Sequence, residues 1–376
     1  IQNDTIHVNA VIQGGPSEKV GLMAGDRIVT VDDSLFVGKK VTNERAMRTL
    51  KGPKGSQVKL GVKRMGEKDL LSFTITRGDI PQNTVDAAYM LNDEIGYVKV
   101  SKFGRTSHVE LLNALAQLNH KKCKGLIIDL RGNTGGYMEA AIRMVNEFLP
   151  EGKLIVYTQG RKYPRAEEFA NGTGSCQKMP LVVLIDEGSA SASEIFTGAI
   201  QDNDRGTVVG RRSFGKGLVQ QPIDFSDGSA IRLTIARYYT PAGRCIQKPY
   251  DSSTDYNKDL IERFNHGELM NADSIHFPDS LKVQTKKLGR TVYGGGGIMP
   301  DYFVPIDTTL YTDYHRNLVA KGAVIKFTMK FIEGHRKELA NKYKKFESFN
   351  EKFIIDDDML ATLREMGEKE GVKFNE

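Results

Sequence analysis

The chain has 376 residues, more than one ordinary hydrophobic core accommodates, so we expect two or three domains. Charged residues make up 27% and hydrophobic residues 39%, which is typical of a soluble globular protein. The net charge of +6 is spread along the sequence and accompanies no recognised nucleic-acid-binding module. A nucleic acid is therefore not expected as a partner.

The sequence has neither an expected membrane span nor a cysteine framework. No apolar run approaches the ~20 residues that a membrane-spanning helix needs. The three cysteines, Cys123, Cys176 and Cys245, lack the spacing of a disulfide framework or a zinc site. Because Ile1 is not an initiator methionine, we expect a mature or trimmed fragment that has lost any targeting signal.

Residues 1–80 have the pattern of a small β-rich domain with one helix. Asn43 is placed to cap that helix, and the Gly-Pro-Lys-Gly segment that begins at Gly52 ends it. The strands expected in this domain cover residues 6–12, 28–31, 58–62 and 70–76.

Residues 81–308 alternate short apolar strands with helices, which is the pattern of a layered α/β domain. The expected strands cover residues 96–100, 126–130, 181–185, 207–209 and 230–239. The expected helices cover residues 107–118, a stretch from the turn at 131–136 to about 149, and 192–199.

Two further regions differ from this alternation. Residues 246–292 are polar and weakly periodic, so we expect an insertion or flap with a helix near residues 259–264. Residues 309–376 are charged and carry apolar residues at helical spacing over 324–346 and 356–366. This pattern predicts a helical C-terminal extension.

A serine that follows the apolar strand at residues 181–185 is a candidate nucleophile. It belongs to Ser189-Ala190-Ser191-Ala192-Ser193-Glu194, where a glycine-containing loop leads into a helix. A helix N-terminus offers unpaired N–H groups and a partial positive charge, which suit a developing oxyanion. Serines at helix starts are nevertheless usually caps, and three alternate here, so this motif alone favours capping.

Lys216 favours a catalytic role for Ser191 over a role as a helix cap. A serine hydroxyl is a poor nucleophile near neutral pH and needs a base beside it. Lys216 stands 25 residues after Ser191, between two glycines, which is an unusual place for a solvated lysine. Burial can remove the charge of a lysine and make it a base. A hairpin-like return of the chain would bring the two residues together, so the pair predicts a Ser-Lys protease.

The motifs around this pair resemble one enzyme family. Ser-Ala-Ser-Ala-Ser-Glu-Ile, Gln201-Asp202-Asn203 and Gly210-Arg-Arg-Ser-Phe-Gly-Lys-Gly are similar, in order and spacing, to the carboxyl-terminal processing peptidases, or tail-specific proteases. The resemblance extends to Asp129-Leu-Arg-Gly-Asn-Thr-Gly-Gly136, to Tyr239-Thr-Pro-Ala-Gly-Arg-Cys-Ile-Gln-Lys-Pro249 and to Gly-Gly-Ile-Met-Pro-Asp301. It covers roughly residues 8–305, and so many motifs in register make coincidence negligible.

The resemblance implies a catalytic role for three residues. Ser191 matches the nucleophile and Lys216 matches the general base. Gln220, four residues after the lysine, matches the residue that orients the base.

The resemblance also implies how the site is supported. The amide of Ala192 and one amide of the Gly135-Gly136 turn match the oxyanion hole. Asp202 matches a position that supports the site, and the alternative for Asp202 is a surface carboxylate at a helix end.

Residues 1–80 resemble the peptide-binding PDZ domain. The resemblance rests on Gly-Gly-Pro-Ser, Gly-Leu and Ala-Gly-Asp-Arg-Ile, and Lys51-Gly-Pro-Lys-Gly is similar to the version within processing proteases. PDZ domains add a C-terminal peptide as a strand while backbone amides hold its carboxylate. The loop that supplies those amides should precede the first strand, so we expect an N-terminally truncated domain with an incomplete carboxylate site. An unliganded β-barrel is the alternative.

The family commonly has Arg where this chain has Lys51, so communication between the PDZ domain and the core is expected to differ in detail.

Other enzyme classes fit the motifs less well. The segment from Gly210 to Lys216 lacks only the last position of a phosphate-binding loop, where Gly217 replaces the Ser or Thr that holds Mg²⁺. Ser213-Phe-Gly-Lys216 fits the Ser-x-x-Lys of penicillin-binding enzymes, but the companion motifs are absent. None of the seven histidines lies in a triad motif.

Two alternatives from other classes stay open. One is a catalytically silent, PDZ-tethered protein that binds peptide tails and cleaves nothing. The other is an acyl-CoA-handling enzyme, since related α/β layers use paired amides for thioester oxyanions. The second would not need the Ser-Lys pair.

The sequence therefore predicts an α/β protein with a layered protease core of the ClpP/crotonase type, a PDZ domain and a helical C-terminal extension. The expected activity is that of a serine endopeptidase, free of metal and nucleotide cofactors, that cleaves proteins near their C-termini through an acyl-enzyme. The resemblance implies substrates bound by their C-terminal tails and a periplasmic place in the bacterial cell envelope, reached by a signal peptide. A homo-oligomer or an adaptor protein as partner stays open.

Overall fold

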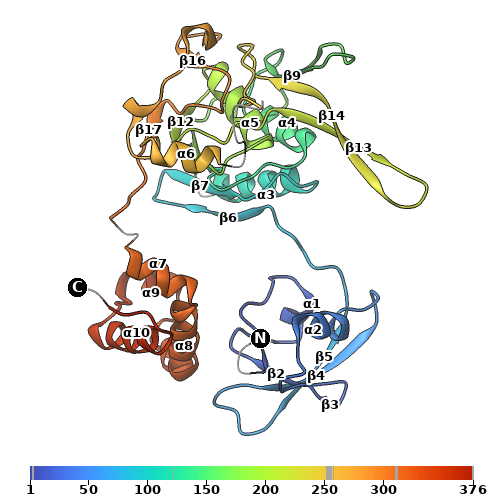
Figure 1. Cartoon of the computed structure of the whole chain (residues 1–376), viewed down its shortest axis with the longest axis vertical. Helices are drawn as coiled ribbons and strands as arrows, with labels where there is room; N and C mark the ends of the chain where they lie inside the picture. The colour runs from blue at the N-terminus through green and yellow to red at the C-terminus, as the bar shows by residue number, and fades with distance from the viewer. Residues whose placement is uncertain (2–3, 121, 251–255, 257, 310–311, 375–376) are drawn as a thin grey trace. The chain divides into compact units, whose positions relative to one another are not determined.

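The computed structural model describes residues 1, 4–120, 122–250, 256, 258–309 and 312–374 (Figure 1). The chain divides into two compact units, residues 83–307 and residues 1–82 with 308–376. The predicted domain boundaries after residues 80 and 308 stay predictions. Among the described residues, no helix combines the length and the apolar character that crossing a membrane requires.

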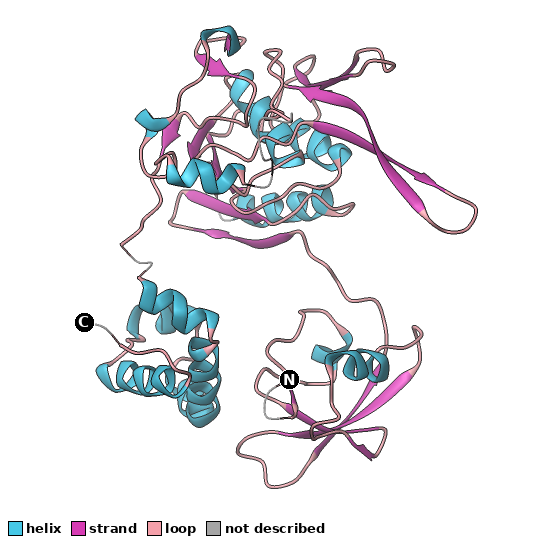
Figure 2. Ribbon diagram, in the orientation of Figure 1, coloured by secondary structure: helices cyan, strands magenta, loops and turns pink. Residues whose placement is uncertain are grey.

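Residues 1–82 contain a small antiparallel sheet of strand order β1-β2-β4-β5, with β3 paired to β2 (Figure 2). The strands are β1 (Ile6–His7), β2 (Arg27–Val31), β3 (Ser34–Leu35), β4 (Gln57–Lys63) and β5 (Leu71–Thr76). The helices are α1 (Pro16–Lys19) and α2 (Asn43–Leu50). Alternate residues of β4, among them Val58, Leu60 and Val62, are buried and form the core with side chains from β2 and α2.

Two local predictions in this region were wrong. Thr42, not Asn43, caps α2, because the Thr42 side chain accepts a hydrogen bond from the Arg45 amide at 3.2 Å. The strand expected over residues 6–12 is limited to Ile6–His7. After Val8 the chain leaves the ladder and forms a turn in which the Gly15 amide donates to the Ile12 carbonyl at 3.0 Å.

The unit of residues 83–307 is built on a six-stranded sheet of order β17-β12-β11-β8-β7-β6. Only β6 at one edge is antiparallel to its neighbour. These strands are β6 (Val85–Met90), β7 (Ile95–Val100), β8 (Gly125–Asp129), β11 (Leu181–Ile185), β12 (Thr207–Gly210) and β17 (Tyr302–Phe303). The predicted α/β core is thereby confirmed.

Three helices pack on this sheet: α3 (Ser107–His120), α4 (Met138–Asn146) and α5 (Ala192–Asp202). All eleven residues of α5 are buried, which is expected of a helix with packed elements on every side. Phe196 of α5 illustrates this, since its ring contacts Phe103 before α3 and Phe148 after α4.

A second sheet of order β10-β9-β14-β13 covers the other side of α4 and α5. Its strands are β9 (Leu154–Gln159), β10 (Ala166–Phe169), β13 (Leu218–Asp224) and β14 (Ala230–Tyr239). The far part of the β13–β14 hairpin extends away from the rest of its unit (Figure 1). This projection explains why most of β13 is exposed.

The predicted insertion at 246–292 contains α6 (Asp259–Asn265), two 3₁₀ turns, Ala272–Ser274 and Asp279–Leu281, and the first strand of a two-stranded sheet, β15 (Lys282–Gln284) with β16 (Thr291–Tyr293). Residues 251–255 and 257 of this insertion lie outside the described residues.

The C-terminal region contains α7 (Asp313–Ala320), α8 (Ala323–Lys342), α9 (Phe346–Lys352) and α10 (Asp357–Lys369). The predicted helical character is confirmed, although the helix expected over 324–346 ends at Lys342 and a separate helix follows. Apolar side chains from α8, α9 and α10, including Phe331, Phe349 and Leu363, line a common cavity of about 320 Å³.

Candidate active site

Ser191 and Lys216 follow neighbouring parallel strands. Ser191 precedes α5 in the connection from β11, and Lys216 lies in the loop after β12. Since β11 and β12 pair in parallel with α5 as their crossover, both loops leave the same edge of the sheet. The two residues therefore approach one another through a strand-helix-strand unit, and the expected hairpin-like return is wrong.

The structure distinguishes the three alternating serines. The buried Ser189 hydroxyl donates to the Leu130 carbonyl at 2.8 Å, and the buried Ser193 hydroxyl donates to the Asn133 carbonyl at 2.8 Å. Ser191 is partly exposed. Two of the serines thus fasten the loop, while Ser191 alone of the three is partly exposed.

The backbone of Ser191 is strained. Its φ of 59° and ψ of −113° lie outside the regions that a residue with a side chain normally adopts. Such a conformation costs about 1–3 kcal/mol and persists only where the surroundings enforce it. Strain on the serine at a strand-to-helix turn is the arrangement that projects a nucleophile out of the turn.

Glu194 enforces this conformation and joins the two predicted catalytic loops. One of its oxygens, Oε2, accepts hydrogen bonds from the amides of Ser191 and Lys216, each at 2.8 Å. The other, Oε1, accepts from the Ser213 hydroxyl at 2.5 Å and the Gly215 amide at 2.7 Å. The backbone nitrogens of Ser191 and Lys216 are therefore held within two hydrogen-bond lengths of each other by one carboxyl group.

Burial sets the protonation behaviour around this junction. Burial raises the pKa of the Glu194 carboxyl, and the hydrogen bonds it accepts oppose this effect. Burial also raises the pKa of Tyr238 well above its usual range, and a hydrogen bond with the Ser191 side chain opposes this only in part. The Tyr238 hydroxyl donates to the Lys216 carbonyl oxygen. Tyr238 is thus held against the backbone of Lys216.

No hydrogen bond between the Ser191 hydroxyl and the Lys216 amine occurs among the described contacts of these residues. Catalytic hydrogen bonds in unliganded enzymes are often long and shorten when substrate binds. The structure therefore places the backbones of Ser191 and Lys216 close together. The catalytic roles of their side chains stay a prediction.

The insertion holds the lysine loop from the other side. Glu268 accepts 2.7 Å hydrogen bonds from both Arg212 and Arg263. The buried Arg263 guanidinium also donates to the carbonyls of Arg212 and Ser213, at 2.7 and 3.1 Å. Part of the region predicted to be a flap is therefore packed against the residues that precede Lys216.

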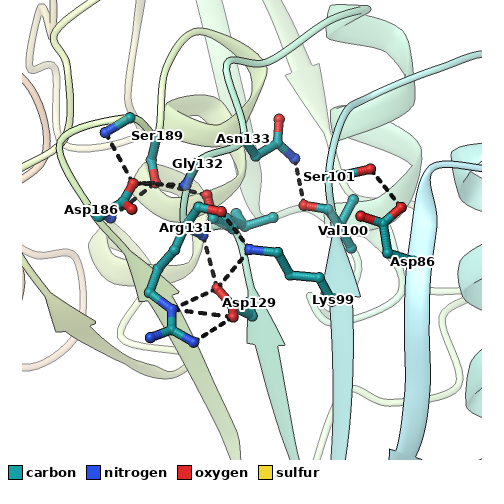
Figure 3. Close-up of polar contacts among 12 residues, drawn as sticks. Asp86, Lys99, Val100, Ser101, Asp129, Arg131, Gly132, Asn133, Asp186 and Ser189 are labelled. Atoms are coloured by element: carbon teal, nitrogen blue, oxygen red, sulfur yellow. Dashed lines mark hydrogen bonds and ion pairs between the residues drawn. The ribbon is translucent and has the colours of Figure 1, made fainter. Parts of the chain in front are cut away.

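The Arg131–Gly136 turn lies against the serine loop (Figure 3). The Asn133 side chain donates to the Val100 carbonyl and accepts from the Gly135 amide, each at 2.9 Å. Asp186 accepts from the Gly132 amide at 2.8 Å. These bonds fix the turn at the edge of the sheet.

The same contacts discriminate between the two predicted glycine amides. The Gly135 N–H is used by Asn133, whereas the described hydrogen bonds assign no acceptor to the N–H groups of Gly136 and Ala192. Two unpaired amides next to a candidate nucleophile suit an oxyanion. The geometry therefore favours Ala192 and Gly136 as the pair of donors.

Gly135→Ala should lower kcat by at least about 100-fold, because a displacement near 1 Å costs about that much in a positioned site. A Cβ at Gly135 would lie 2.7 Å from Ser191 Cβ and 2.9 Å from the Ala192 nitrogen, and its φ is +99°. Gly132→Ala is the matched control, since its φ of +71° carries a similar backbone penalty while no atom lies within 4 Å. Steady-state kinetics on both variants would contradict the assignment if they lost activity equally.

A polar cluster lies at the start of this turn. The Tyr97 hydroxyl donates to Asp129 Oδ2 at 2.6 Å, and Arg131 donates to the same oxygen at 2.7 Å (Figure 3 shows the arginine contact). Burial tends to raise the pKa of Asp129, but hydrogen bonds from Arg131 and Tyr97 lower it to about 2. Burial and the bond to Asp129 raise the pKa of Tyr97 to about 12.

These shifts predict how stability depends on pH. The folded state favours neutral Tyr97, so its contribution is complete below the unfolded value near 10 and is lost as the pH rises through about 12. The Asp129 contribution is present above its unfolded value and is lost as the pH falls through about 2. Tyr97→Phe should therefore flatten the decline of the denaturation midpoint between pH 10 and 12. An unchanged alkaline decline would contradict this.

Gln220 lies with Lys216 in an open cleft of about 880 Å³. The cleft is lined by residues of β13, of β14 and of the end of β9, together with Gln247, Tyr250 and Tyr256. Gln220 is exposed on β13, and no side-chain hydrogen bond of Gln220 occurs among the described contacts. Its predicted role in orienting Lys216 is compatible with this position and stays a prediction.

Asp202 lies at the opposite end of α5 from Ser191. Its carboxylate forms an ion pair with the fully buried Arg244 and accepts the Ala242 amide at 2.8 Å. Asp202 is itself fully buried, so the alternative of a surface carboxylate is wrong. The structure gives it the task of fastening the segment after β14 to the helix, away from the reacting groups.

The sequence interpretation missed Glu194 and Tyr238. Glu194 had a recognisable signal, since Ser191-x-x-Glu194 is the capping-box spacing in which the glutamate reaches back to the amide before the helix. Tyr238 had none, because its role depends on which face of β14 meets the Lys216 loop.

Comparisons with known proteins agree with these observations. Residues 94–254 match peptidase family S41, residues 2–76 match the PDZ domain, and residues 314–376 match a family of unknown function. The predicted PDZ resemblance is therefore confirmed.

Three relatives show the extent of the similarity. A carboxyl-terminal-processing protease of Synechocystis is 37% identical over 252 residues, 66% of this chain and 58% of that protein. The carboxy-terminal processing protease CtpB of Bacillus subtilis is 34% identical over 66% of this chain and 52% of its own length. A probable CtpA-like serine protease of Staphylococcus aureus strain MRSA252 is 30% identical over 371 residues, 96% of this chain and 70% of that protein.

The chain spans only 58% and 52% of the length of the first two relatives. The match to the third extends over almost the whole chain and more than two thirds of the relative. Together with the S41 match over the sheet that carries Ser191 and Lys216, it confirms the resemblance inferred from the motifs. The chain belongs to peptidase family S41, among the carboxyl-terminal processing proteases that contain a PDZ domain.

Proposed function

We propose that this chain is a serine endopeptidase that cleaves protein substrates near their C-termini, with Ser191 as nucleophile and Lys216 as general base. The observation that carries the proposal is the shared Glu194 carboxyl, which holds the amides of Ser191 and Lys216 at 2.8 Å each. A buried group that joins these two loops has a clear purpose in a Ser-Lys dyad.

The proposed reaction begins with proton transfer. The amine of Lys216, acting as general base, takes the Ser191 proton as Oγ attacks the substrate carbonyl, and the N–H groups of Ala192 and Gly136 stabilise the oxyanion. The C–N bond then breaks, and the Lys216 ammonium returns the proton to the departing amine. Water, activated by Lys216 in the same way, releases the acyl group and restores Ser191.

We also assign the capture of substrate tails to residues 1–82. An apolar cavity of about 540 Å³ in this region is lined by side chains from the chain start, α2 and the sheet, including Val8, Leu50 and Leu60. An apolar C-terminal side chain fits such a lining, and strand addition is the binding mode of PDZ domains. An adaptor protein or a second copy of the chain is not required by this assignment.

Hydrolysis of unfolded casein by the purified chain tests the proposal. We expect cleavage that persists in chelator and without nucleotide, because the sequence motifs of the site supply no metal ligands or complete phosphate loop. Capture of peptides without cleavage would instead support the silent binding protein. Thioester hydrolysis without proteolysis would support the acyl-CoA-handling alternative.

We further propose a periplasmic location in the bacterial cell envelope, reached by an export signal. The support is the family resemblance. Fractionation of the native host with an antibody against the chain would test it, and recovery in the cytoplasm alone would contradict it.

A further inference from the structure

The cleft that contains Lys216 and Gln220 has an uneven charge. Its lining includes two arginines, Arg161 and Arg237, and, among the residues that the structure describes, no aspartate or glutamate. A concave surface of one charge sign focuses its potential on whatever occupies it. An anionic group of the occupant is the natural complement.

The two arginines differ from most others in this unit. Arg211, Arg244 and Arg290, for example, each pair with a carboxylate. For Arg161 and Arg237, the ion pairs and hydrogen bonds among the described residues include no partner. Both arginines are exposed and line the cleft.

The position of Arg237 relates it to the predicted chemistry. In the sheet, Arg237 of β14 pairs with Leu218 of β13, which lies midway between Lys216 and Gln220. On its other side Arg237 pairs with Gln159, and Arg161 follows two residues later. An extended peptide advances about 3.3 Å per residue. A substrate group bound by Arg237 would therefore lie roughly three substrate residues or fewer from a peptide bond that is cleaved beside Lys216.

From this placement we propose that Arg161 and Arg237 form a subsite for a substrate carboxylate close to the scissile bond. A guanidinium presents paired N–H donors that match a carboxylate, so the two groups form charge-assisted hydrogen bonds. The carboxylate is either an acidic side chain or the free C-terminus of the substrate. The inference rests on the proposed peptidase function, because it assumes that a peptide occupies this cleft.

Binding and hydrolysis test the subsite separately. Fluorescence anisotropy measures the binding of labelled peptides to the Ser191→Ala protein. One peptide series carries Glu or Gln at each of three positions on either side of the scissile bond. A second pair differs only in having a free or an amidated C-terminus. One acidic position or the free terminus should tighten binding about tenfold, equivalent to ~1.4 kcal/mol. The preference should weaken as salt is raised, since exposed charges are screened.

Variants identify the residues responsible. Arg237→Gln and Arg161→Gln in the same background should each reduce the preference severalfold, the double variant should abolish it, and Arg237→Lys should retain part of it. Arg232→Gln is the matched control, because Arg232 is exposed on the same strand but does not line the cleft. Equal affinity for all peptides, or a preference that survives the double variant, would overturn the subsite.

Hydrolysis by the otherwise unaltered chain keeps the two proposals distinguishable. Charge-selective binding without cleavage would support the subsite and contradict the peptidase function. Cleavage of acidic and neutral peptides with equal kcat/KM and equal affinity would support the peptidase function and contradict the subsite.

Discussion

Ser191→Ala and Lys216→Ala should each lower kcat/KM on an unfolded protein substrate by about 10⁴-fold or more, and the double variant should be no worse than either alone. Nucleophile and base act as one unit, so removing either member removes most of what the pair contributes. Both substitutions leave the backbone amides that Glu194 holds in place, so the fold should persist. Steady-state kinetics with circular dichroism and thermal melting would measure both effects.

Ser193→Ala is the control for the serine. Its buried hydroxyl binds only the Asn133 carbonyl, so the change should cost stability of about 1 kcal/mol and leave most of the activity. The dyad would be wrong if Ser193→Ala were as inactive as Ser191→Ala. It would equally be wrong if Lys216→Ala kept near-full activity, or if the double variant were much worse than the singles.

The layered core was predictable because its strands and helices have strong local signals. The strand at Leu181–Ile185 is a continuous apolar run and is found at those residues. The strand at Ala230–Tyr239 is also found at those residues, although most of it is exposed. Propensity and pattern agree with the fold at these positions, so reading along the sequence was sufficient.

Strands β9, β10 and β13 were missed, although β9 with β10 and β13 with β14 are antiparallel pairs of strands that lie close together in the sequence. Strand β13 has no buried alternation, carries Pro222 at a sheet edge and is mainly exposed, so no periodicity marks it. The short β10 is exposed at all four positions. Hydrophobic patterning detects burial, and β10 and β13 have little. Strand β9 is different, because its central residues Ile155, Val156 and Tyr157 are buried.

The sequence motifs single out candidate site residues, but they do not contain the geometry of the site. The motifs place Ser191 and Lys216 at loop positions, yet the parallel pairing of β11 and β12 decides that the loops meet. Asp202 is a second example, because its motif does not reveal that it lies at the opposite end of α5 from Ser191. Proximity depends on topology, which these local signals do not contain.

Glu194→Gln should reduce kcat by at least about 100-fold with a smaller change in KM, and should lower the free energy of unfolding by about 2–5 kcal/mol. The native carboxyl accepts four hydrogen bonds, from three amides and the Ser213 hydroxyl. A glutamine amide presents two N–H donors in place of one accepting oxygen. Two of the donors that the carboxyl now binds would then face the N–H groups of the glutamine and lose their acceptor. Each buried donor without an acceptor costs about 1–3 kcal/mol.

The effect on kcat should exceed what the lost stability alone explains, because Glu194 positions the loops of both Ser191 and Lys216. Kinetics measured at a temperature where the variant remains fully folded separate the two effects. Glu139→Gln is the control, since Glu139 is exposed and pairs only with Arg143 on the surface of α4. That change should alter stability by less than about 1 kcal/mol and leave kcat unchanged. A folded Glu194→Gln protein with kcat within twofold of the parent would show that this carboxyl does not hold the dyad together.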